Sequence, residues 1–246
     1  MNKMNGVYPC YKNQFKIDIT GGDGSTAGNQ KTIADMESFT VSVDGNVEEW
    51  NPFDTEGWTR RLVTGKAITI SVSGKRNVGD AGNDYIESIA TETGSGCSTT
   101  LTWAFPSGAQ LVMPCVINVT EWGSGDSRSV GPLSFDAMSD GKPTFTPAMP
   151  ALSVTAEAGT SAAGDTKVTA TVLNQGDTLQ YKKNPATNVT YGTTATTYSG
   201  TSMTSGTAKT ISSCIASDVI EVVEFNGSGK AVAAGYITLT SSEIKQ

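Results

Sequence analysis

The feature that most constrains this chain is an alternation of apolar and polar residues with a period of two. Residues 39–44 and 67–73 each place an apolar side chain at every second position. This pattern is typical of strands with one buried and one solvated face, so it predicts two half-buried antiparallel strands. The segment between them, residues 45–65, is expected to be a long loop because it is polar and carries several aromatic residues.

Further strands are expected at 15–19, 101–105, 109–122 and 133–137. Abundant Ser, Thr and Gly favour β-sheet with many turns over helix. The interruption of 109–122 by Pro114 predicts an edge strand or a bulge. The segment GGDGSTAGNQ, residues 21–30, is expected to be a flexible loop.

One helix is expected, at about residues 83–93. Asp80 or Asn83 can cap its N-terminus, an apolar stripe that includes Ile86 gives it one buried face, and Gly94 can end it. A mainly β protein with one flanking helix is therefore the predicted class for the first part of the chain.

A proline-rich segment divides the chain into two predicted domains. We expect a first domain at 1–146, a linker at 147–150 and a second domain at 151–246. The first 150 residues hold 17 acids and 11 bases, a net charge of -6, whereas the remainder holds 7 and 6, a net charge of -1. Six short candidate strands with recurring turn signals predict an immunoglobulin-like (Ig-like) β-sandwich for the second domain. They are 152–156, 167–172, 179–182, 209–212, 219–225 and 231–239.

Composition excludes several chemistries. The chain has no histidine, which rules out Ser-His-Asp and Cys-His catalysis and histidine-bearing metal sites. The four cysteines (Cys10, Cys97, Cys115 and Cys214) are scattered without metal-ligand spacing, and we interpret them as reduced thiols. A net charge of -7 disfavours tight nucleic-acid binding. We expect no cofactor, no metal, no membrane span and no signal peptide.

Motif matches are weak. Residues 139–142 fit S-x-x-K without its partner motifs, and two Gly-Asp-rich stretches lack calcium-loop spacing. The acids of residues 45–65 would lie in an exposed loop without the dry pocket of a glycosidase. No catalytic residue is assigned, and the chain is not expected to be an enzyme.

The aromatic segment 45–65 is the best candidate contact surface. Three large aromatic residues on a protruding loop would be a liability in a monomer, and protein interfaces favour aromatics and Arg. A loop folded back on its own core is the alternative. The candidate contact residues are Glu48, Glu49, Trp50, Phe53, Asp54, Trp58, Arg60 and Arg61.

The block from residue 35 to 147 resembles the major tail tube proteins of long-tailed (siphovirus-like) bacteriophages. The resemblance rests on ESFTVSVDG (37–45), the insert 46–66, AITISVSGKRN (67–77), NDYIESIA (83–90) and the strands of 105–147. The second domain, with DVIEVVEFNGSGKAVAAGYITLT (218–240), resembles Ig-like modules appended to phage tail and capsid proteins. The implied fold is a tail-tube β-sandwich or barrel followed by an Ig-like sandwich.

The resemblance implies hexameric rings that stack into a hollow tube through which the genome passes. If each subunit gives four strands at ~4.8 Å spacing and ~40° tilt, the 24-stranded barrel has a backbone diameter of roughly 45–50 Å. A polar inner face would let DNA slide without sticking. The lumen-facing candidates are Thr40, Ser42, Asp44, Thr69, Ser71, Ser73, Asn118, Thr120, Ser134 and Asp136.

The same resemblance implies the partners and the location. The partners would be other copies of the chain, a tape measure protein, and tail terminator and distal tail proteins, with transient passage of duplex DNA. The location would be the virion tail, after synthesis in the bacterial host cytoplasm, and the appended domain favours a non-contractile tail. The alternative function is a carbohydrate- or cell-surface-binding two-domain β protein, such as a fibre or adhesin.

Overall fold

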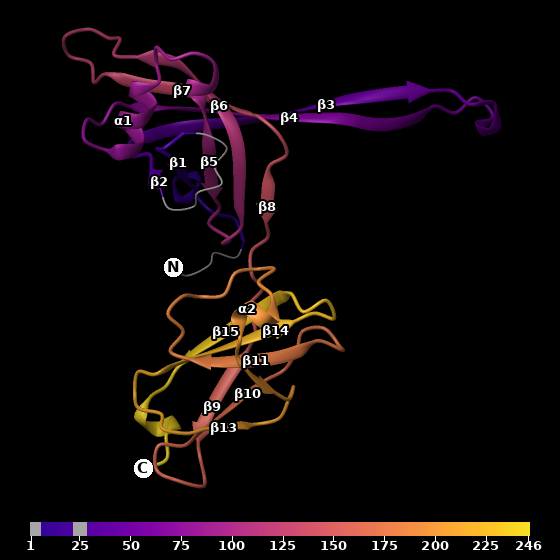
Figure 1. The fold of residues 1–246 in the computed structure, drawn as a ribbon, viewed down its shortest axis with the longest axis vertical. Helices are drawn as coiled ribbons and strands as arrows, with labels where there is room; N and C mark the ends of the chain where they lie inside the picture. Colours follow the sequence, from indigo (N-terminus) through magenta and orange to yellow (C-terminus); the bar gives the residue numbers. More distant parts are fainter. Residues whose placement is uncertain (1–5, 22–28) are drawn as a thin grey trace. The chain divides into compact units, whose positions relative to one another are not determined.

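A computed structural model describes residues 6–21 and 29–246, and most of the loop expected at 21–30 lies outside these residues. The chain divides into two compact units, Met1–Phe145 and Thr146–Gln246. Each unit is described by itself. Both are built mainly from antiparallel β-sheet with few helices, which confirms the predicted fold class (Figure 1).

The first unit is one eight-stranded sheet. Its strand order is β2-β1-β5-β6-β7-β4-β3, every neighbouring pair along this order is antiparallel, and β8 pairs with β6. The strands are β1 (Gln14–Asp18), β2 (Gln30–Thr32), β3 (Met36–Trp50), β4 (Arg60–Lys75), β5 (Ser98–Ala104), β6 (Gln110–Trp122), β7 (Pro132–Ser139) and β8 (Thr144–Thr146).

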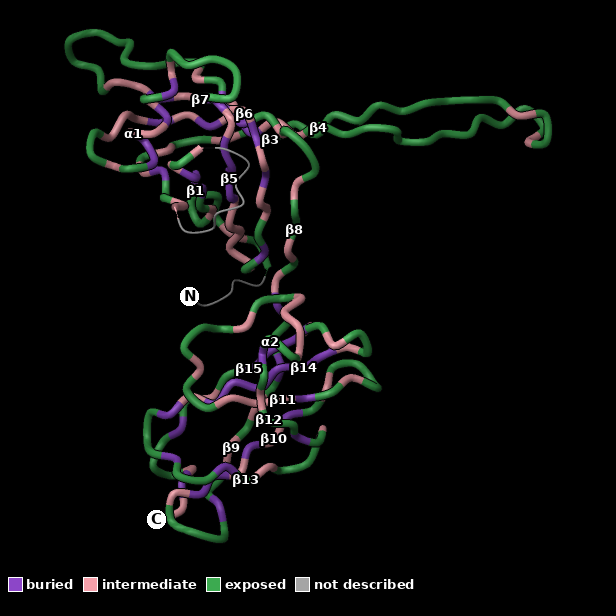
Figure 2. Tube along the Cα trace, viewed as in Figure 1, coloured by how far each residue is buried: buried purple, intermediate pink, exposed green. Residues whose placement is uncertain are grey.

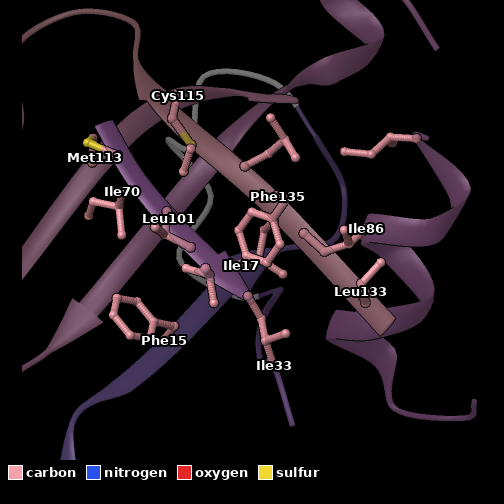
Figure 3. Close-up of a cluster of buried hydrophobic side chains, with 14 residues drawn as sticks. Phe15, Ile17, Ile33, Ile70, Ile86, Leu101, Met113, Cys115, Leu133 and Phe135 are labelled. Carbon is pink, nitrogen blue, oxygen red and sulfur yellow. The ribbon is translucent and has the colours of Figure 1, made fainter. Parts of the chain in front are cut away.

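The core of this unit is formed by one face of the sheet and covered by a single helix. Figure 3 shows Ile70, Leu101, Met113 and Phe135 from four different strands converging on Ile86 of helix α1 (Ala81–Ser88). All five are at most 1% exposed. The alternation read from the sequence therefore has the expected cause, since every second residue from 68 to 72 of β4 and from 133 to 137 of β7 belongs to this cluster.

The helix is shorter than expected and begins earlier. Asp80 is its N-cap and accepts a hydrogen bond from the backbone N–H of Asn83 at 3.0 Å, whereas Asn83 lies buried inside the helix. The Asn83 amide donates instead to the carbonyl of Ala34 at 2.9 Å. Residues after Ser88 form turns and the 3-10 helix η3 (Gly94–Cys97), so the prediction of a helix reaching 93 is wrong.

The expected loop at 45–65 is also wrong, because most of it continues the two strands. β3 and β4 stay paired as far as Trp50 opposite Arg60, and only residues 51–59, which include the 3-10 helix η2 (Phe53–Thr55), are outside the ladder. Since β4 pairs with β7 only from Thr69 onward, residues 43–68 form a free two-stranded hairpin. We call residues 43–68 the arm and 51–59 the arm tip (Figures 1 and 2).

Pro114 does not place β6 at an edge, because β6 lies between β5 and β7. The carbonyl of Pro114 accepts a hydrogen bond from the N–H of Asp140, just past the end of β7, and the ring nitrogen faces the same side. Its missing N–H therefore costs no bond to β7. The one irregularity of the β6–β7 ladder lies between Val119 and Glu121.

The second unit contains two antiparallel sheets. Their orders are β13-β10-β9 and β12-β11-β14-β15, and a shared buried cluster that includes Val168 and Val222 draws on both. The strands are β9 (Val154–Ala158), β10 (Thr166–Ala170), β11 (Thr178–Lys183), β12 (Thr201–Met203), β13 (Lys209–Ile211), β14 (Val219–Phe225) and β15 (Ala231–Thr238).

The remaining short helices are η1 (Cys10–Lys12) in the first unit and α2 (Ala195–Tyr198) and η4 (Ser241–Glu243) in the second.

Six strands were expected here, and the sequence analysis did not anticipate β12. The strand β8 was not anticipated either, and it ends just before the linker expected at 147–150. Among the residues described, no helix is both long and apolar enough to cross a bilayer.

Candidate assembly surfaces

The ten predicted lumen residues share one face of the sheet, opposite the core. In the β3–β4 ladder Thr40 faces Ser71, in the β4–β7 ladder Ser71 faces Asp136, and in the β7–β6 ladder Asp136 faces Asn118. One polar row therefore crosses four strands. Parallel rows on either side add the other predicted residues, together with Ser38 and Glu121. We call these twelve residues the polar face.

None of the twelve is buried in the unit's core. They bond mainly to one another: Ser71 donates to a carboxylate oxygen of Asp136, the hydroxyls of Ser38 and Ser73 lie 2.7 Å apart, and Ser134 lies 3.4 Å from Glu121. The members are hydroxyls, one amide and three carboxylates, and none is a base. The polar face therefore carries negative charge and short side chains.

The opposite face is apolar in the body, and it continues along the arm as an apolar stripe that charged residues such as Lys66 interrupt. Val43 faces Ile68 and Val47 faces Val63 on the arm, on the same side as core residues such as Val72. Ile68 packs against the edge of the core, but nothing within the unit covers the three valines, because Val43 is 59%, Val47 48% and Val63 51% exposed. A folded β-ribbon with one exposed apolar side is a surface that a monomer leaves unsatisfied.

The four strands under the polar face end in two open edges. β3 is the last strand of the sheet, so its outer edge has no partner strand. At the other side, β5 pairs with β6 only as far as Val116, and residues 117–122 of β6 pair with β7 alone. Among the described strands, these two edges have unpaired backbone groups that can accept another strand.

The arm tip is ordered by its own hydrogen bonds. The hydroxyl of Thr55 lies 2.9 Å from the carbonyl of Pro52 and 2.7 Å from that of Trp58. Arg60 pairs with Asp54 at 3.5 Å and Arg61 with Glu49 at 2.5 Å. Phe53 is 107% and Trp58 79% exposed, so the aromatic rings project from a shaped turn.

The eight predicted contact residues therefore lie on the outer arm. Glu48, Glu49 and Trp50 end β3, Phe53 and Asp54 lie in η2, and Trp58 follows. Arg60 and Arg61 begin β4. None folds back on the core, since all eight are exposed.

Sequence reasoning missed the apolar stripe of the arm and one acid of the polar face, Glu121. Val47 continues the spacing of Val41 and Val43 on β3, which was a weak signal, whereas the bulge beside Val63 breaks the period on β4. Glu121 could not be placed because the bulge after Val119 changes which face each residue takes.

Helix α1 is fixed to the sheet by one buried base. The side chain of Arg76, 9% exposed, binds Asp84 at 2.6 Å and also Glu87, whose other oxygen accepts from the Trp122 ring nitrogen at 2.9 Å. The hydrogen bond from Arg76, with that from Trp122, holds the pKa of Glu87 below its usual value. This network ties α1 to the ends of β4 and β6, the two strands that carry the assembly surfaces.

Within the described ranges 6–21 and 29–246, no group of three Cys, Asp or Glu side chains could hold a metal ion. The thiol of Cys115 is buried in the core, and this burial raises its pKa to about 12.

Comparison with known proteins gives structural matches only. No family model matches the sequence, and no curated protein matches it. One similar solved structure is a chain from the tail of an empty gene transfer agent (GTA) particle with C6 symmetry, at 17% identity and a TM-score of 0.46. Another is from the virion of a native GTA particle, at 16% identity and a TM-score of 0.44. Each covers 57% of this chain and 100% of the matched chain. Both TM-scores are below 0.5, so these likenesses do not establish the function of this chain.

Proposed function

We propose that this protein is a structural subunit of a phage-like tail tube, without a catalytic step, and that it polymerises as stacked rings around a channel for DNA. The observation that carries the proposal is the polar face, which spans four strands and ends in an open strand edge on both sides. The resemblance of residues 35–147 to tail tube proteins supports the same function.

Ring closure follows from the strand directions. The strands β6, β7, β4 and β3 alternate in direction because each neighbouring pair is antiparallel. Copies related by rotation about one axis would therefore place the outer edge of β3 antiparallel to the free edge of β6 in the next copy. An even number of strands per copy gives a barrel that is antiparallel throughout and has no exposed edge.

Six copies would contribute 24 strands. At ~4.8 Å between strands and ~40° tilt, the barrel would have a backbone diameter of roughly 45–50 Å, which admits a DNA duplex after side chains narrow it. The polar face would line this channel. Its carboxylates repel phosphates, and its hydroxyls give no fixed positive charge to hold DNA in place.

The apolar side of the arm would then face outward from the barrel. Val43, Val47 and Val63 would be covered by neighbouring copies, which removes the exposed stripe of the monomer. This assembly also accounts for β3 and β4 continuing past the body.

The partners proposed are other copies of the chain, with tape measure, tail terminator and distal tail proteins at the ends and interior of the tube. The second unit is proposed as an Ig-like module of a virion tail, in a particle whose subunits are made in the host cytoplasm. These finer assignments rest on the sequence resemblance.

The test is to shorten the arm without disturbing the body. Because Gly45 pairs with Lys66, residues 46–65 can be replaced by Asn-Gly, which forms a two-residue hairpin turn. The proposal predicts that the full chain forms tubes by negative-stain microscopy at high concentration, whereas the shortened chain stays monomeric and keeps the far-ultraviolet circular dichroism of a folded β protein. The matched control, Val78→Ser, changes an exposed residue of the body and should still form tubes. Tubes from the shortened chain would refute the role of the arm.

A further inference from the structure

A pocket of about 640 Å³ opens at the seam between β1 and β3. Its floor is apolar, with Phe15, Ile33, Phe39 and Val72, and Phe15 and Phe39 meet edge to face at 4.9 Å. The two strands are not hydrogen-bonded neighbours, because β1 lies between β2 and β5 whereas β3 is the last strand of the sheet and pairs only with β4. The seam pocket therefore gives access from outside to the apolar interior of the first unit.

The arm tip has the shape and chemistry of an insert for such a pocket. Phe53 and Trp58 project from a turn that the hydrogen bonds of Thr55 already order. Binding would therefore cost little further conformational entropy. Aromatic side chains that enter apolar pockets are typical anchors of protein interfaces.

The chain's own tip cannot occupy its own pocket. Met36 lines the pocket and begins β3, while Trp50 ends the same continuous strand. At ~3.3 Å per residue these two residues are about 45 Å apart. The insert must therefore come from a second copy.

The pocket rim is acidic, and the arm around its tip carries both acids and bases. Asp35 and Glu37 lie at the pocket, and Glu37 is 62% exposed even though Lys75 is 3.7 Å away. Arg60 and Arg61 follow the arm tip and are 55% and 63% exposed. Both bases are paired in the free chain, to Asp54 and Glu49. Docking would exchange these partners for the acids of the pocket rim, which would fix the orientation of the insert.

We propose that the arm tip of one copy docks in the seam pocket of a second copy, with Phe53 as the inserted side chain. This inference rests on the proposed self-assembly and names the receiving surface of the arm. Because insert and pocket lie on different parts of one molecule, the contact is head-to-tail and propagates around a ring or along a stack.

A native cysteine makes the contact testable. Cys10 lines the seam pocket and is exposed, whereas Cys97, Cys115 and Cys214 are buried. With Asp54→Cys, an exposed tip residue beside Phe53 that leaves the inserted ring in place, mild oxidation of the assembled full-length chain should give a ladder of disulfide-linked multimers on non-reducing gels. Adding Cys10→Ser should abolish the ladder. Leu173→Cys, an exposed position in the second unit, is the control for random collision and should give no ladder.

The outcomes separate this inference from the proposed function. Tubes by microscopy without a Cys10-dependent ladder would overturn the seam pocket and leave the tube subunit standing. A ladder of equal strength with Leu173→Cys would also overturn the pocket. If the unmodified chain forms neither tubes nor multimers, both proposals fail.

A mixing experiment tests the same contact without cysteine chemistry. Phe53→Ser removes the aromatic ring that is inserted. Thr32→Trp places a large side chain in the pocket from an exposed position at its rim. Neither variant alone should form long assemblies. Their mixture should form a one-to-one complex, since the first keeps the pocket and the second keeps the insert. A mixture that sediments as two unassociated variants would contradict the inference.

Discussion

Ser71 of β4 donates a hydrogen bond to the carboxylate of Asp136, directly opposite on β7. The pair lies in the middle of the polar face and fixes a negative charge among hydroxyl groups. In the proposed tube that charge would face the passing DNA, and six copies would repeat it around each ring.

Reversing charge on the polar face should make the tube hold DNA. Asp44→Lys with Asp136→Lys replaces two acids by two bases per copy at positions outside the core. We expect tubes that still assemble but retain fluorescent duplex DNA, with retention that weakens as salt is raised. Pelleting of labelled DNA with tubes measures the effect.

The matched control makes the same charge change away from both assembly surfaces. Glu92→Lys with Glu157→Lys replaces two exposed acids and should leave DNA retention near the unmodified level. Equal retention by both double variants would contradict a channel lined by the polar face.

Removing the Arg76 side chain should destabilise the first unit. Arg76→Met keeps the apolar stem but leaves Asp84 and Glu87 without their base. We expect a loss of about 2 kcal/mol, below the range for fully buried pairs because both carboxylates keep water contact. All four tryptophans lie before residue 146, so tryptophan emission during urea unfolding reports this unit alone. An unchanged midpoint would show that the network does not fix α1.

The helix cap can be tested independently. Asp80→Ala removes the acceptor for the N–H groups of Asn83 and Ala34, and should cost about 1 kcal/mol. Asp80→Asn keeps a side-chain oxygen and should retain most of that stability. The same urea experiment compares the two variants, and equal losses would contradict a capping role.

The second unit should lose stability in acid through Asp218. Hydrogen bonds from Asn184 and from the N–H of Ile215, with Lys183 nearby, hold the pKa of Asp218 below its usual value of 3.8. Its contribution is therefore complete above the unfolded pKa and is lost as pH falls through the lowered folded value. Thermal unfolding followed by circular dichroism should show a steeper decline below pH 4 for the unmodified chain than for Asp218→Asn. Parallel profiles would rule out this residue as the cause.

The alternation of Phe39, Ser71 and Phe135 with their neighbours was sufficient to predict the strands and the side each residue takes. It also placed all ten lumen candidates on the face opposite the core. The arm was missed because residues 46–66 were judged by polarity, and a ribbon exposed on both sides has no buried face to reveal its period. The seam pocket could not be predicted, since it depends on how strands distant in sequence approach.

The central claim is tested most directly by cryo-electron microscopy of the purified full-length chain at high concentration. The account predicts stacked rings with a hollow channel, in which β3, β4, β7 and β6 form a closed barrel and Thr40 and Asp136 face the channel. A chain that stays monomeric, or an assembly in which these two side chains are buried between copies or face outward, would contradict it.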